Sequence, residues 1–130
     1  MTGVFEIADG FIDTVAKHHP QSATHMGVPG FDHLLTDYSP DAAEAFNADV
    51  RSTVREMEST IPTNERERLC RDTFLDEANL YIEQFESREH LRDLNVMFSP
   101  VQSVRSIFDL MPQGSVEAWE NIASRMEKIG

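Results

Sequence analysis

The sequence contains a single cysteine, Cys70, in 130 residues, so no disulfide can form within the chain and the redox compartment is unconstrained. Long apolar runs are also absent, and none approaches the ~20 residues that a membrane-spanning helix needs. Residues 1–6 lack the basic flank and apolar block of a secretory signal peptide. We therefore expect a cytoplasmic protein that does not interact with membranes.

Basic residues are scarce. The chain has 11 lysines and arginines against 23 aspartates and glutamates, which gives a formal net charge of −12. Nucleic acids and anionic membranes both attract clustered Lys and Arg side chains, and an acidic field repels them. The composition therefore argues against a nucleic-acid partner, and we interpret the acidity as a contribution to solubility.

The motifs of common active sites are missing. No histidine is followed by glutamate, so the His-Glu-x-x-His zinc motif is absent. No Glu-x-x-His segment exists for a di-iron bundle, and no Gly-x-Ser-x-Gly elbow for a serine nucleophile. Four of the five histidines, at positions 18, 19, 25 and 33, cluster in sequence, but their spacing matches no ligand set. We therefore assign no catalytic, metal-binding or cofactor-binding residue and interpret these histidines as loop and surface residues.

Charged residues in the segment 64–92 have a structural interpretation. Glu67 with Arg71, and Arg68 with Asp72, are spaced as i,i+4 pairs on a solvated helix face. Cys70 falls on the apolar side of the same helix, which indicates a buried structural thiol rather than a nucleophile.

Apolar residues recur at three- and four-residue steps in five segments, and no segment alternates as a strand would. Four of the segments begin at a residue suited to capping a helix, namely Ser39, Thr63 or Asn64, Ser99 and Ser115. The pattern predicts a single all-α domain, a bundle of about five helices with a long irregular loop between the first two. The predicted helices lie near residues 3–18, 40–58, 64–92, 100–111 and 116–129.

The segment 98–112 is apolar and punctuated by prolines, and Trp119 follows on the next predicted helix. One interpretation is a tight αα-hairpin that contributes to the core. The other is a docking face, with apolar residues around Val101, Val104, Phe108 and Met111 and on the helix that carries Trp119 and Met126. Self-association through such a face should strengthen as salt screens the acidic charge.

Five short motifs follow one another along nearly the whole length of the chain. Residues 20–27 read Pro-Gln-Ser-Ala-Thr-His-Met-Gly, and residues 37–40 read Asp-Tyr-Ser-Pro. Residues 100–102 read Pro-Val-Gln, and residues 108–112 read Phe-Asp-Leu-Met-Pro. Residues 117–126 read Glu-Ala-Trp-Glu-Asn-Ile-Ala-Ser-Arg-Met. In these motifs and in their order the chain resembles the domain of unknown function 885 family.

The resemblance implies a bacterial protein whose longer relatives look like zinc metallopeptidases. Their zinc motifs, His-Glu and a later Pro-Gly-His, would lie beyond residue 130, so no family ligand can be placed on this chain. Residues 1–130 would then be the N-terminal helical region of a zinc-dependent peptidase-like protein, with the remainder of a larger polypeptide as its partner. The alternative is a self-standing all-α interaction module without enzymatic activity, which has other partners or self-associates.

Overall fold

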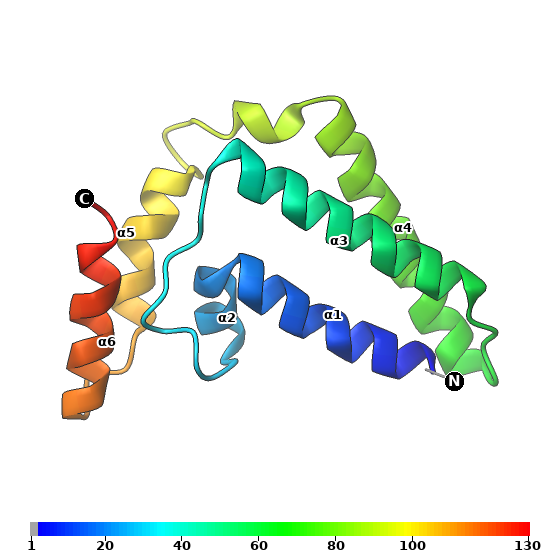
Figure 1. The fold of residues 1–130 in the computed structure, drawn as a ribbon, viewed down its shortest axis with the longest axis horizontal. Coiled ribbons are helices and arrows are strands. Elements are labelled where there is room, and N and C mark those ends of the chain that lie inside the picture. Colours follow the sequence, from blue (N-terminus) through cyan, green and yellow to red (C-terminus); the bar gives the residue numbers. More distant parts are fainter. Residues whose placement is uncertain (1–2) are drawn as a thin grey trace. The chain divides into compact units, whose positions relative to one another are not determined.

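Residues 3–130 are described by the computed structural model, and over this range the chain is helical with no strand. The expected all-α class is confirmed (Figure 1). The elements are α1 (Val4–His18), α2 (Pro20–Met26), α3 (Pro40–Ser59), α4 (Glu65–Glu86), the 3-10 helix η1 (Glu89–Arg92), α5 (Pro100–Leu110) and α6 (Val116–Glu127).

The chain divides into two compact units, and each unit is built from two stretches of sequence. The first unit comprises residues up to Thr14 together with Ser39–Arg92, and so holds α3, α4, η1 and most of α1. The second comprises Val15–Tyr38 and Asp93–Gly130, and holds α2, α5 and α6.

The core of the first unit forms where α1 meets α3 and α4. Val4 and Met57 are fully buried and Ile7 is nearly so, and half-buried Cys70 and Phe74 pack against them. Cys70 is therefore a packing residue, in agreement with its position on the apolar side of the helix.

Aromatic rings extend this core along α4. Phe11 meets Phe74 edge to face at 5.1 Å between ring centroids, and Phe46 meets Tyr81 in the same way at 5.4 Å. Such edge-to-face pairs add about 0.5–1.5 kcal/mol beyond the burial of apolar area. The rings thus hold α3 and α4 side by side, as Figure 1 shows.

Helices α3, α4 and α5 begin at the positions predicted from the sequence. The hydroxyl of Ser39 accepts a hydrogen bond from the Ala42 N–H, and Asn64 Oδ1 accepts one from the Glu67 N–H. At Ser99 the Gln102 half of the capping box is present, because the Ser99 N–H donates to Gln102 Oε1. These bonds satisfy N–H groups that a helix start leaves unpaired.

The prediction of a long irregular loop between the first two predicted helices is partly wrong, because residues 20–26 of that loop form α2. Pro20 occupies the first helical turn, where its missing N–H costs nothing. Gly27, with φ of 75°, ends the helix in the left-handed conformation, and its N–H donates to the carbonyl of Thr24. Residues 27–39 remain irregular.

The third predicted helix is also too long, because α4 ends at Glu86 and η1 follows after a break. Arg88 adopts a positive φ of 62°, which a continuous α-helix does not allow. The Ser87 hydroxyl donates to the carbonyls of Glu83 and Gln84, satisfying acceptors at the helix end.

Both arginines expected in i,i+4 pairs on α4 form hydrogen bonds with other residues, although the charge of Asp72 still acts on Arg68. Arg68 pairs with Glu65, while Arg71 donates to the carbonyls of Met57 and Glu58 at 3.2 and 3.3 Å. Arg71 therefore caps the C-terminus of α3, where a positive charge is favoured by the helix dipole.

Candidate functional site

The second unit is organised around a buried arginine. Arg125 on α6 has no solvent-exposed area, although arginine side chains are rarely fully buried. Its Nε donates to the carbonyl of Leu34 at 2.6 Å, and its Nη2 donates to the carbonyl of Phe31 at 3.0 Å. The same nitrogen also contacts the carbonyl of Pro20 at 3.4 Å. The guanidinium thus satisfies backbone acceptors from both ends of the segment 20–34.

Two side chains complete this arrangement. Arg125 Nη2 donates to the hydroxyl of Thr24 at 2.9 Å, and that hydroxyl donates to Asp32 Oδ1 at 2.8 Å. We call the set formed by Pro20, Thr24, Phe31, Asp32, Leu34 and Arg125 the Arg125 cluster. Its members come from α2, from the irregular segment that follows and from α6, so α6 fixes the course of a segment about 100 residues earlier in the chain.

The cluster has an electrostatic cost. Burial lowers the pKa of Arg125, and the negative charge of Asp32 partly offsets that effect. Of the atoms in the described part of the chain, Arg125 Nη1 is among the few buried ones without a hydrogen-bond partner. Taking a cation out of water is costly, so the hydrogen bonds that Arg125 does make must offset its desolvation.

Gln21 fixes the far end of the same segment. Its Oε1 accepts a hydrogen bond from the Tyr38 hydroxyl at 3.1 Å and a longer one from the Thr36 N–H at 3.4 Å. Burial raises the pKa of Tyr38, while hydrogen bonds to Gln21 and Thr36 act in the opposite direction. These contacts join α2 to the last residues of the irregular segment. Gln21 and Thr36 are both buried, so the hydrogen bond between them is shielded from water.

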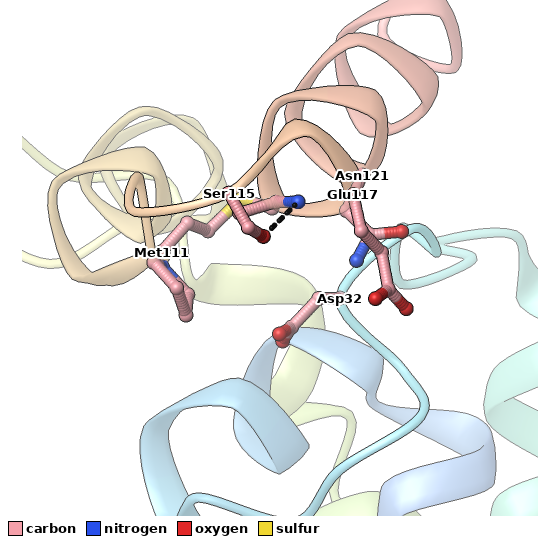
Figure 2. Close-up of a pocket in the computed structure, with 7 residues that line it drawn as sticks. Asp32, Met111, Ser115, Glu117 and Asn121 are labelled. Carbon is pink, nitrogen blue, oxygen red and sulfur yellow. Dashed lines mark hydrogen bonds between the residues drawn. The ribbon is translucent and has the colours of Figure 1, made fainter.

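An open hollow of about 180 Å³ adjoins the cluster. It is lined by Asp32, Met111, Pro112, Ser115, Glu117, Ala118 and Asn121. Figure 2 shows Asp32 on one side of the hollow and the polar side chains from the start of α6 on the other.

The chemistry available in the hollow is limited. The Ser115 hydroxyl already accepts the Ala118 N–H at 3.1 Å, as Figure 2 shows, so it serves as a helix cap. Asp32 and Glu117 offer acceptor oxygens, but no histidine or cysteine lines the hollow beside them. The lining can accept hydrogen bonds from a small polar group and contains no nucleophile paired with a base.

The histidines do not assemble into a metal site. Within residues 3–130, no group of three or more His, Cys, Asp and Glu side chains could hold a metal ion. His25 and His33 are exposed, whereas His19 is half-buried and its pKa is lowered by burial and by the neighbouring charge of His18. His90, in the first unit, stacks on Phe85 with 4.4 Å between ring centroids.

The apolar residues expected on a docking face have different environments. Met111 is buried, while Val101, Trp119 and Met126 are more than half exposed. Helix α6 therefore buries only part of its apolar surface. Its buried side carries Ala118, Ile122 and Arg125.

No helix between residues 3 and 130 has the length and hydropathy needed to cross a membrane. A family model described as "Bacterial protein of unknown function (DUF885)" matches residues 20–130. The matched range includes every residue of the Arg125 cluster. No curated protein matches the chain.

Proposed function

The chain belongs to the DUF885 family of bacterial proteins, and from this premise we propose that it is the N-terminal helical region of a zinc-dependent peptidase-like protein. In this proposal the region carries neither the metal nor the catalytic groups, and it helps to wall the substrate cavity of the larger protein. The observation that carries the proposal is the family match over residues 20–130, a range that includes the Arg125 cluster. Pro20, Thr24 and Arg125 all make structural contacts there.

The residues of this chain do not fit a zinc ion. A zinc site takes His, Cys or carboxylate ligands from side chains that converge on one point, with at least three from the protein. The described residues hold no such group of three, and the hollow beside the cluster has only Asp32 and Glu117. The proposal therefore derives no hydrolytic step from these residues.

An exposed apolar loop supports the assignment to a larger protein. The N–H groups of Met97 and Phe98 donate to Asn95 Oδ1 at 2.9 and 2.7 Å, and the Asn95 side chain donates to the Phe98 carbonyl. In this turn Val96 and Phe98 are 93% and 80% exposed. Neighbouring exposed apolar side chains of this kind are expected on a surface that another element covers.

The second candidate is a self-standing interaction module, and the same loop favours it, because a separate partner would cover Val96 and Phe98 equally well. The two candidates differ in the coding sequence expected after Gly130. A reading frame that continues into His-Glu and Pro-Gly-His motifs supports the first candidate, and one that stops within a few codons contradicts it.

Metal analysis of the chain, purified without a tag, tests the proposal that residues 1–130 contain no zinc ligands. We expect no stoichiometric zinc after dialysis and no hydrolysis of a mixed peptide substrate. One tightly bound zinc per chain that is lost in the His25→Ala or His33→Ala variant would overturn the proposal. The Cys70→Ala variant is the control, because Cys70 packs in the other unit and should not alter the metal content.

A further inference from the structure

Helix α6 has a second apolar side that the described residues, 3–130, leave uncovered. Val116, Trp119 and Met126 are 77%, 55% and 58% exposed, and Ala123 between them is also exposed. The positions follow one another at steps of three, four and three residues, which places them on one side of the helix. The buried residues Ala118, Ile122 and Arg125 are centred on a neighbouring side of the helix, so the exposed stripe adjoins the core at Ile122 and extends away from it.

Steps of three and four residues are the spacing of the core positions of two packed helices. Over the twelve residues of α6 the stripe extends for about 18 Å, or three helical turns. This geometry fits another α-helix lying along α6 better than an extended peptide, which would need free backbone groups at the edge of a sheet.

The charged residues beside the stripe determine which kind of partner helix would bind favourably. Glu120 and Glu127 are exposed, lie seven residues apart and border the stripe on one side. On the other side the corresponding positions are Ile122 and Ile129. A second copy of α6 would gain no ion pair. In an antiparallel pair the glutamates would face glutamates, and in a parallel pair they would face the isoleucines.

We propose that the outer face of α6, formed by Val116, Trp119, Glu120, Ala123, Met126 and Glu127, binds an amphipathic α-helix of a partner protein. The partner helix carries an apolar stripe with Lys or Arg beside it, opposite Glu120 and Glu127. The net charge of −12 favours the approach of such a basic helix. The inference does not depend on the proposed function, because it rests on α6 alone.

Trp119 is the only tryptophan of the chain, so its fluorescence reports directly on this face. The probe is a synthetic helical peptide of about four heptads, long enough to be helical on its own, with Leu at the core positions and Lys beside them. We expect a saturable blue shift of the Trp119 emission. A matched peptide with Glu in place of Lys should bind about tenfold more weakly, since two attractive pairs become two repulsive ones. Binding of the Lys peptide should weaken as salt is added.

Two sets of variants make the test specific. Met126→Glu should abolish the blue shift while raising the negative charge, which separates binding at this face from general attraction to an acidic protein. Glu120→Lys combined with Glu127→Lys should reverse the preference toward the Glu peptide. The control, Glu77→Lys combined with Glu83→Lys, makes the same change of net charge at exposed positions of α4 and should keep the preference for the Lys peptide.

Three results would overturn the proposal. The first is an unchanged peptide preference in the Glu120→Lys, Glu127→Lys variant. The second is full retention of the blue shift in Met126→Glu. The third is a blue shift that appears without peptide as the protein is concentrated and grows with salt, which would show that a second copy covers the face.

Discussion

A guanidinium nitrogen of Arg125 lies 2.9 Å from the hydroxyl oxygen of Thr24, although the two residues are 101 positions apart in the chain. Thr24 lies on α2 and Arg125 on α6, and both fall within the range that the family model matches. The two side chains suit the contact, because the arginine supplies several donors in a fixed plane and the threonine hydroxyl accepts one of them.

Replacing Arg125 by methionine should destabilise the second unit by at least about 3 kcal/mol. The substitution roughly keeps the volume of the side chain but leaves the carbonyls of Phe31 and Leu34 without their donor and removes the positive charge near Asp32. Urea unfolding followed by Trp119 fluorescence measures the change. Arg105→Met, at an exposed position of α5, is the control and should alter stability by less than about 0.5 kcal/mol. A similar small effect at both positions would contradict the prediction.

The Thr24→Val substitution should cost about 1–2 kcal/mol, because the methyl group that replaces the hydroxyl can neither accept from Arg125 nor donate to Asp32. Thr24→Ser keeps the hydroxyl and should retain most of the stability. Unfolding of the two variants under identical conditions separates the hydrogen bonds from the packing of the side chain. Equal losses in both variants would assign the effect to packing.

Substitution by alanine should change the stability of the protein in opposite directions at Gly27 and at Gly10. Gly27 has a φ of 75° at the end of α2, so Gly27→Ala should destabilise the protein by about 1 kcal/mol or more. Gly10 lies within α1 with no atom near the position of an added Cβ, so Gly10→Ala should stabilise it by about 0.5–1 kcal/mol. Thermal unfolding followed by circular dichroism compares them, and shifts of the same sign would contradict the assignment of α2.

His19 should make the fold sensitive to mild acid. Burial and the neighbouring His18 lower its pKa in the folded state below the unfolded value of about 6.5. The unfolded chain therefore binds the proton first as pH falls, and stability is lost below about pH 6.5 until the folded-state pKa is passed. In the His19→Gln variant this part of the pH dependence should disappear. His25→Gln, at an exposed position, should keep the wild-type profile, and identical profiles for all three proteins would contradict the prediction.

The helices that begin at Ser39, Asn64 and Ser115 could be predicted because their caps are local, with donor and acceptor three residues apart. Helix α2 was missed for a reason visible in the sequence. Pro20 begins the helix and Gly27 ends it, which is the usual order of proline and glycine at helix ends. The helix has only seven residues, however, and so short a segment shows little apolar periodicity. The end of α4 depends on the conformation of Arg88, which propensity does not specify.

The Arg125 cluster could not be predicted from the sequence, for a different reason. Its bonds are mostly to backbone carbonyls, which every residue type provides, so the residues at positions 31 and 34 carry no mark of the contact. The available signal was Arg125 itself, which occupies a helical position in line with the apolar residues Ala118 and Ile122. A charged residue on the buried side of a helix predicts a partner without identifying it.

Hydrogen exchange of the segment 20–36, in wild-type protein and in Arg125→Met, tests the account most directly. If the guanidinium fixes the course of this segment, the Val28 and Thr36 amides, which donate to Ala23 and Gln21, should lose protection in the variant. Amides within α3 and α4 should keep theirs, because those helices belong to the other unit. Unchanged protection of residues 20–36 in the Arg125→Met protein would contradict the account.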